Sequence, residues 1–204
     1  MITVPTAVAA LKRNYPGIRV SIEVDFSETL LSKMRERKFD IVIARLHQAA
    51  GLEAFEFEEL DDSPHGIAVR ADHPLLCKRA LTLRDLVQQT WILPPPGNVM
   101  RDGVTALFLR KRVPLPHSVV ETAALPIMVN LLARSDMVAP LASELIEPYR
   151  VYGLLAALPL AFDVRLGSAG IVTPRDRRHS PAAQVALDAL RQAAQQRDGR
   201  ARRR

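Results

Sequence analysis

The first part of the chain alternates between helical and extended patterns of apolar residues. Val4, Val8 and Leu11 recur at helical spacing, and the Tyr-Pro-Gly triplet that begins at Tyr15 predicts the end of that helix. Residues 18–24 then alternate apolar and polar side chains, which is typical of a strand. We therefore expect a helix followed by a strand.

A second helix and a second strand are expected next. Asp25 or Ser27 can cap the helix, which would bury Met34 and its neighbouring leucines. The run 39–44 is largely apolar, as in a strand buried on both faces, and it ends at Arg45. The order helix, strand, helix, strand predicts a parallel sheet with crossover helices.

The rest of the chain continues this alternation of short elements. A loop is expected around Gly51, and Thr82 with Asp85 forms a capping-box pattern. Pro126 suits the first turn of a helix at 125–133. Further strands are expected within 66–75, 91–98, 118–122, 137–141 and 164–173, and further helices around Val104, Leu107 and Phe108 and from Ser180 and Pro181 onward, the last burying Leu187, Leu190 and Ala194.

The composition is that of an ordinary globular protein. The 204 residues are 48% hydrophobic and 25% charged, which suffices for one large domain or two small lobes. No apolar run could span a bilayer and no secretory signal opens the sequence, so we expect a cytoplasmic location without membrane contact. Cys77, the only cysteine, is expected to be a small hydrophobic residue rather than a nucleophile.

The net charge of +6 is carried partly by the segment 197–204, which holds five arginines and one aspartate. Such a run could contact nucleic-acid phosphates. A solvated, disordered terminus is the alternative that we prefer. No helix-turn-helix pattern with a basic recognition face is visible, so we expect no DNA-binding domain in this chain.

Sequence patterns for catalysis or cofactor binding are missing. The five histidines are scattered, without a second ligand at metal-binding spacing. The stretch 167–170, Gly-Ser-Ala-Gly, lacks the order of a nucleophile elbow, and no phosphate loop occurs. Asp61 and Asp62 would face apart on a strand. We therefore expect no metal, no cofactor and no enzymatic activity.

Five stretches, taken in order, resemble a known family. They are YPGIRVSI from Tyr15, LLSKMRERKFDIVIARL from Leu30, GIAVRADHPL from Gly66, LTLRDLVQQTWILPPPG from Leu81 and GIVTPRDRRHSPAA from Gly170. In this order and spacing the chain resembles the effector-binding region of LysR-type transcriptional regulators. The stretch VETAALPIMVNLLARSDMVAPL, from Val120, is most similar to the subgroup of galactose-binding-protein regulators and protocatechuate-pathway regulators.

The resemblance implies an α/β fold like that of type 2 periplasmic binding proteins, in which two crossing strands join two α/β lobes with a ligand cleft between them. Lobe I would comprise 1–67 and 167–204, and lobe II 68–166, with crossings near 67–71 and 165–171. The winged helix-turn-helix and linker helix of the family are not among these residues. DNA contact would therefore occur only through that absent domain of the full-length protein.

In the resembled family, lobe I begins with a strand ahead of its first helix. Only Met1 to Thr3 precede the helix expected at 4–14. We therefore expect lobe I to lack this central strand, whose place would be between 18–24 and 39–44. The effector contact that follows this strand would be missing, or shifted to a residue such as Thr6.

The resemblance also implies where the effector binds. Ligands of open α/β sheets bind beyond the carboxyl ends of strands, where Arg45 could hold a carboxylate through two hydrogen bonds; pairing with a nearby acid is the alternative. Ser27 could offer its hydroxyl and nearby backbone N–H groups to an anion, or could be a plain helix cap. The contribution of lobe II is assigned to Pro96, Gly97, Asn98 and Thr122.

The expected function is that of the small-molecule sensor of a LysR-type regulator. Its effector would be a small organic acid, aromatic or sugar-derived. The fragment would form a homodimer through its first helix (Val4, Val8, Leu11) and the helix bearing Val104 and Phe108, and the full-length protein a tetramer. A solute-binding receptor of the same fold is the alternative function, and an enzyme on the same lobes is a third.

Overall fold

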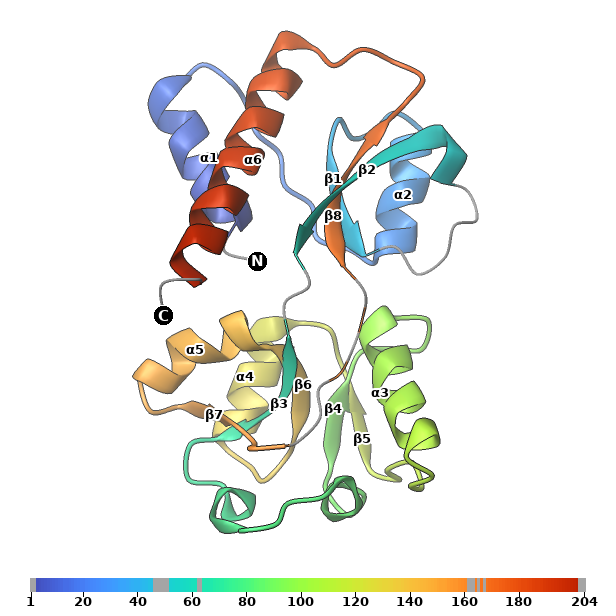
Figure 1. Ribbon diagram of the computed structural model, residues 1–204, viewed down its shortest axis with the longest axis vertical. Helices are drawn as coiled ribbons and strands as arrows, with labels where there is room; N and C mark the ends of the chain where they lie inside the picture. Colours follow the sequence, from blue (N-terminus) through green and yellow to red (C-terminus); the bar gives the residue numbers. More distant parts are fainter. Residues whose placement is uncertain are drawn as a thin grey trace. The chain divides into compact units, whose positions relative to one another are not determined.

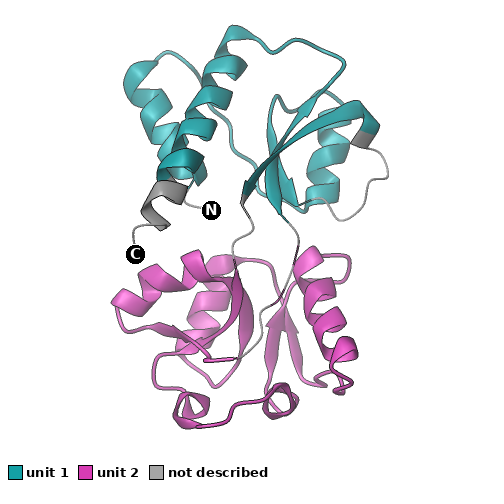
Figure 2. Ribbon diagram, in the orientation of Figure 1, with its two compact units in different colours: residues 1–62, 167–204 teal, residues 63–166 magenta. Residues whose placement is uncertain are grey.

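The computed structural model describes residues 3–45, 52–61, 64–160, 164, 166 and 168–201. It divides into two compact units, one formed by 1–62 with 167–204 and one by 63–166 (Figure 2). The first division falls at 62/63, whereas the sequence placed the lobe boundary at residue 67. Gly51, Asp62, Arg165 and Gly167, which entered the sequence analysis, lie outside the described residues.

Unit 1 is built around a three-stranded sheet of order β1-β8-β2 (Figure 1). Both outer strands run antiparallel to β8. Its elements are α1 (Thr3–Asn14), α2 (Ser27–Arg35), β1 (Val42–Arg45), the short 3-10 helix η1 (Leu52–Ala54), β2 (Phe55–Asp61), β8 (Ala169–Pro174) and α6 (Pro181–Ala201).

Helices cover both faces of this sheet. On one face, Ile171 of β8 packs with Ala7 of α1 and Leu187 of α6. On the other face, Val172 packs with Met34 of α2. Successive residues of β8 thus point to opposite faces, as the period of a strand requires. The predicted burial of Leu187, Leu190 and Ala194 in the last helix is confirmed.

Two predictions for unit 1 are wrong. Residues 18–24 form no strand, and Val24 is 84% exposed. A strand needs a partner for its backbone N–H and C=O groups, and no described strand pairs with this segment. The expected parallel sheet is also absent from the described part of unit 1, since β1 pairs antiparallel with β8. The apolar run of β1 is explained by the helices that pack on both faces of the sheet, and it does not indicate a parallel strand.

Part of the loop expected after the strand at 39–44 is the strand β2, whereas Gly51 lies outside the described residues. β2 reads Phe-Glu-Phe-Glu-Glu-Leu-Asp, and its four acids are of a kind that strands usually avoid. At the end of the chain, α6 extends to Ala201. Much of the arginine-rich segment that we expected to be disordered therefore continues a helix, while residues 202–204 lie outside the described part.

Unit 2 contains an antiparallel sheet of order β6-β3-β7 and a parallel pair, β4 and β5. A parallel bridge between Trp91 and Val138 links the two. Its elements are β3 (His65–Arg70), the 3-10 helices η2 (Pro74–Cys77) and η3 (Leu83–Leu86), β4 (Trp91–Leu93), α3 (Val99–Arg110), β5 (Val119–Glu121), α4 (Leu125–Ala133), β6 (Ala139–Ala142), α5 (Ser143–Val151) and β7 (Leu155–Ala157).

Trp91 and Phe108 belong to one of the two apolar clusters that form the core of unit 2. Their rings meet edge to face with centroids 5.5 Å apart, and the Trp91 indole N–H donates to the Leu86 carbonyl at 2.8 Å. Phe108 belongs to the predicted apolar face of α3, which is confirmed. The capping box of Thr82 and Asp85 is also confirmed, although it opens a 3-10 turn.

The two helices expected to supply the dimer faces are α1 and α3, and some of their apolar side chains serve the core of their own unit. Leu11 is buried within unit 1, and Val104 and Phe108 are buried in the core of unit 2. These three side chains hold their own units together and are not available to a second chain. No helix among the described residues is long and apolar enough to cross a membrane.

Candidate functional site

Ser27 and Arg45, the two candidate residues of unit 1, are in contact. The Ser27 hydroxyl accepts a hydrogen bond from the backbone N–H of Arg45, with 3.3 Å between Oγ and N. Ser27 is the first residue of α2 and Arg45 the last of β1. The amino end of a helix and the carboxyl end of a strand therefore meet at this point, with both side chains half-buried.

The amino end of α2 lacks a side-chain cap. Its N-cap residue is Phe26, which has no cap hydrogen bond, and the Asp25 carboxylate accepts instead from the Phe26 N–H at 2.8 Å. The prediction that Asp25 or Ser27 caps this helix is therefore wrong. Because no described side chain accepts a hydrogen bond from the first N–H groups of α2, the partial positive charge of this helix end is available to an anion.

The extended segment before Ser27 is tied to the far end of α2. Lys33 pairs with the carboxylate of Glu23 and lies 3.5 Å from that of Asp25. The hydrogen bond with Glu23 raises the pKa of Lys33, so the ammonium remains charged. These pairs are exposed and contribute little stability, but they restrict the path by which residues 18–26 reach Ser27.

The candidate residues of unit 2 meet at one edge of its parallel pair. β4 and β5 are in register, with Leu93 opposite Glu121. Parallel strands end at the same edge, so the turn that follows Leu93 and Thr122 after β5 are neighbours. The Thr122 N–H donates to the Leu93 carbonyl at 2.9 Å. Pro96, Gly97 and Asn98 belong to that turn, and the structure thus brings all four residues to this edge.

The turn itself has a defined shape. Gly97 has φ +83°, a left-handed conformation that favours glycine. Asn98 caps α3, because its side-chain oxygen accepts from the Met100 N–H at 2.8 Å. The Thr122 hydroxyl accepts from the Ala124 N–H at 3.1 Å and keeps its own proton for another acceptor. The amino ends of α3 and α4 both begin at this edge.

Two residues that the sequence analysis missed hold this turn in place. Arg101 of α3 donates to the Pro94 carbonyl at 3.1 Å and pairs with the carboxylate of Glu121 at the end of β5. One guanidinium therefore joins the turn, the helix and the neighbouring strand. Nothing in the local sequence around Arg101 indicates a partner 20 positions away.

Within the described residues, no group of three or more His, Cys, Asp and Glu side chains could hold a metal ion. Beside the carboxylates of Glu28 and Glu121, the polar groups near Ser27 and at this edge of unit 2 are hydroxyls, an amide, guanidinium groups and helix amino ends. Such groups recognise an anionic or hydroxylated small molecule.

The LysR substrate binding domain family matches residues 2–195. The chain belongs to this family. It is 33% identical over 187 residues to the HTH-type transcriptional regulator GbpR of Azospirillum brasilense, covering 91% of this chain and 55% of that protein. It is 25% identical over 190 residues to the regulator PcaQ of Agrobacterium fabrum, covering 93% of this chain and 61% of that protein. The chain thus spans little more than half the length of these relatives, and they agree with the subgroup expected from the sequence.

Solved structures share the fold of this LysR domain. The regulatory domain of Synechocystis CcmR in complex with 2-PG matches with a TM-score of 0.78 and 22% identity over 92% of this chain and 88% of that one. The effector binding domain of QuiR in complex with shikimate matches with a TM-score of 0.72 and 19% identity over 95% of this chain and 91% of that one. The expected α/β fold, like that of type 2 periplasmic binding proteins, is confirmed.

Proposed function

We propose that this LysR domain senses a small organic acid, and that Arg45 and the amino end of α2 hold its carboxylate. The contact between the Ser27 hydroxyl and the Arg45 N–H carries the proposal, because it fixes an arginine of β1 beside an uncapped helix end. A guanidinium and a helix amino end both favour negative charge. The polar edge formed by Pro96, Gly97, Asn98 and Thr122 is proposed to take part in effector binding as well.

Similar domains support this ligand class. QuiR was solved with shikimate, which is a carboxylic acid, and CcmR with 2-PG. The relatives of the chain carry names of transcriptional regulators rather than enzymes. We propose that effector binding shifts an equilibrium between states of a larger, cytoplasmic regulator, and that the domain catalyses no reaction. In that regulator this domain would pair with a second copy, with four chains in the full-length protein, and DNA would contact a winged helix-turn-helix outside these residues.

Titration calorimetry with benzoate, shikimate and gluconate tests the ligand class, with benzylamine as a cationic counterpart of benzoate. We expect at least one acid to bind and the amine not to bind. Arg45→Ala should weaken that binding by about 1.5–3 kcal/mol, the contribution of a hydrogen bond to a charged group. Arg13→Ala, at an exposed position of α1, is the matched control. Equal affinity in the Arg45→Ala and Arg13→Ala variants would exclude Arg45 as a ligand residue.

A further inference from the structure

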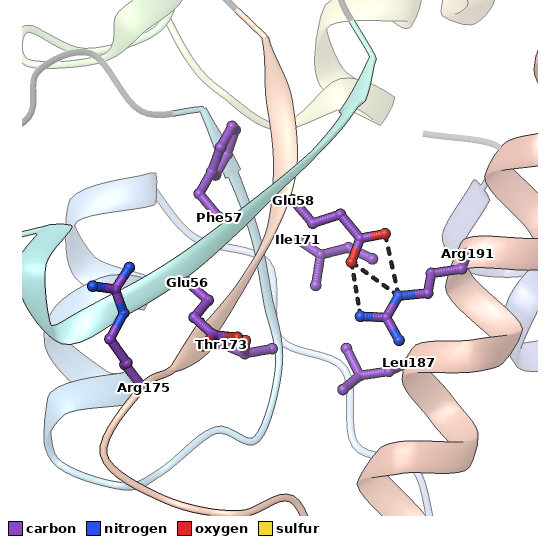
Figure 3. A pocket seen from close by; sticks show the side chains of 8 residues that line it. All are labelled: Glu56, Phe57, Glu58, Ile171, Thr173, Arg175, Leu187 and Arg191. Atoms are coloured by element: carbon purple, nitrogen blue, oxygen red, sulfur yellow. Dashed lines mark hydrogen bonds and ion pairs between the residues drawn. The ribbon is translucent and has the colours of Figure 1, made fainter.

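Unit 1 contains a cavity of about 360 Å³ on the sheet face that α6 covers (Figure 3). Its walls come from β2, β8 and α6. The volume lies within the range of small-molecule sites. The cavity is separate from Ser27 and Arg45. It is floored by Ile171 and Leu187, whereas α2 packs on the opposite face of the same sheet.

The register of the two strands determines what the cavity presents. Glu56 lies opposite Thr173, and Glu58 lies opposite Ile171. Residues two apart on a strand share a face, so all four side chains line the same side of the sheet. Figure 3 shows Glu56 and Thr173 between Arg175 on one side and the Glu58–Arg191 pair on the other.

One end of the cavity is closed by an ion pair. Arg191 of α6 donates from Nε and Nη2 to the Glu58 carboxylate at 2.9 and 2.8 Å, and its Nη1 lies 3.3 Å from Asp188. The bond to Glu58 raises the pKa of Arg191. Because the Arg191 guanidinium and the Glu58 carboxylate bond to each other, we treat this pair as part of the cavity wall and not as a contact to the ligand.

The other polar side chains of the cavity have no partner among the described residues. The hydroxyl of Thr173 makes no hydrogen bond to any described residue, and because no fully buried side-chain N or O atom of the described residues lacks a partner, this oxygen is open to the cavity. Glu56 and Arg175, which line the same cavity and are both exposed, form no ion pair within the described part of the chain. The cavity therefore offers one carboxylate, one hydroxyl and one guanidinium beside an apolar floor.

We propose that this cavity binds a small zwitterion of the amino-acid class. Its ammonium group would bond to Glu56 and the Thr173 hydroxyl, its carboxylate to Arg175, and its side chain would lie on Ile171 and Leu187. A ligand with only a carboxylate would leave the Glu56 carboxylate without a cationic partner, and a ligand with only an amine would leave the Arg175 guanidinium without an anionic partner. A zwitterion can pair with both charges.

Such a ligand would contact both strands through which the chain passes between its units. β2 ends at Asp61, just before unit 2 begins at residue 63, and β8 starts at Ala169, just after unit 1 resumes at residue 167. Binding at the cavity would therefore be a second input to the sensor, apart from the organic-acid site.

Ligand-observed NMR on the whole chain with each of the standard protein amino acids tests the proposal. We expect one or more with an apolar side chain, leucine first, to bind. Its analogues 4-methylpentanoate and 3-methylbutylamine each lack one charge and should bind about tenfold more weakly or worse. Failure of every amino acid to bind at millimolar concentration would overturn the proposal, as would equal binding of either analogue.

Variants locate the site. Thr173→Val keeps the shape of the side chain and should weaken leucine binding several-fold, as should Glu56→Gln and Arg175→Gln. The controls Glu53→Gln and Arg178→Gln alter exposed residues near the same strands and should leave binding unchanged. Thermal melts confirm that each variant is folded. Loss of leucine binding in Arg45→Ala but not in Thr173→Val would place the ligand at the organic-acid site and contradict a second site, whatever the outcome for organic acids.

Discussion

Gly170 of β8 lies directly against the ring of Phe57 on the neighbouring strand β2. A Cβ added at Gly170 would overlap the Phe57 ring and would come within 2.6 Å of the Glu58 carbonyl oxygen. The side chain of Phe57 therefore occupies the space that any other residue at position 170 would need. This close approach joins the two strands that border the proposed zwitterion cavity.

Gly170→Ala should lower the free energy of unfolding by about 1–3 kcal/mol, because the backbone carbonyl cannot yield as a flexible side chain could. Urea unfolding measures the loss. Gly17→Ala is the control, since a Cβ at Gly17 meets nothing within 4 Å. Adding Phe57→Leu to Gly170→Ala should recover only part of the loss, because the contact with the Glu58 carbonyl remains. An unchanged midpoint for Gly170→Ala would contradict the close approach.

Asp85 should make unfolding depend on pH between about 4 and 2. Its hydrogen bond with Lys78, followed by those with Thr82, lowers the pKa of Asp85 from 3.8 to about 2. A pKa that is lower in the folded state means that the ionised group stabilises the fold above pH 4. That contribution is lost as the pH falls through the folded value.

The variant Asp85→Asn measures this contribution. At neutral pH it should melt below the unsubstituted protein, and the gap should close as the pH is lowered from 5 to 2. Asp102→Asn, an exposed acid in α3 for which no partner is described, is the control. A carboxyl titration of Asp85 by NMR with a midpoint near 3.8 would show that the capping box does not hold the charge.

The spacing of apolar residues correctly predicted the helices and turns whose stabilising contacts join residues close in sequence. The apolar face of α3 around Phe108, the start of α4 at Pro126 and the buried face of α6 all follow from side chains three or four residues apart. The capping box of Thr82 and Asp85 belongs to the same class, whereas the cap expected from Asp25 or Ser27 did not form. In each case the stabilising contact lies within one or two turns of the chain.

Strands were harder to predict because each one pairs with a strand that is distant in the sequence. Residues 18–24 have the alternation of a strand but no described neighbour to pair with, and β1 was assigned the wrong direction. Of the candidate site, the sequence placed Ser27 and Arg45 at element ends. It could not show that they touch, nor that Arg191 pairs with Glu58 across 133 positions.

Glu28 should weaken the organic-acid site in unit 1. It is exposed in the first turn of α2, beside Ser27, and its negative charge opposes that of a carboxylate ligand. Glu28→Gln should therefore raise affinity by about 0.3–1 kcal/mol at low salt, with the gain shrinking as salt is added. Glu36→Gln, at the other end of the helix, is the control. A fall in affinity for Glu28→Gln would argue that the anion does not bind at the amino end of α2.

The pair of Arg101 and Glu121 should act on the turn at Gly97 rather than on the ligand directly. Arg101 bonds both the Pro94 carbonyl and Glu121, so its loss frees the turn from β5. If that edge takes part in effector binding, Arg101→Gln and Glu121→Gln should each weaken binding of the acid found by calorimetry.

A double-mutant cycle separates this positioning role from a direct contact. Because each substitution breaks the same ion pair, the double variant should lose clearly less binding energy than the sum of the two single losses. Arg110→Gln, an exposed position at the end of the same helix, should leave affinity unchanged. Strict additivity would mean that Arg101 and Glu121 act independently, and unchanged affinity in all three variants would remove this edge of unit 2 from the proposed site.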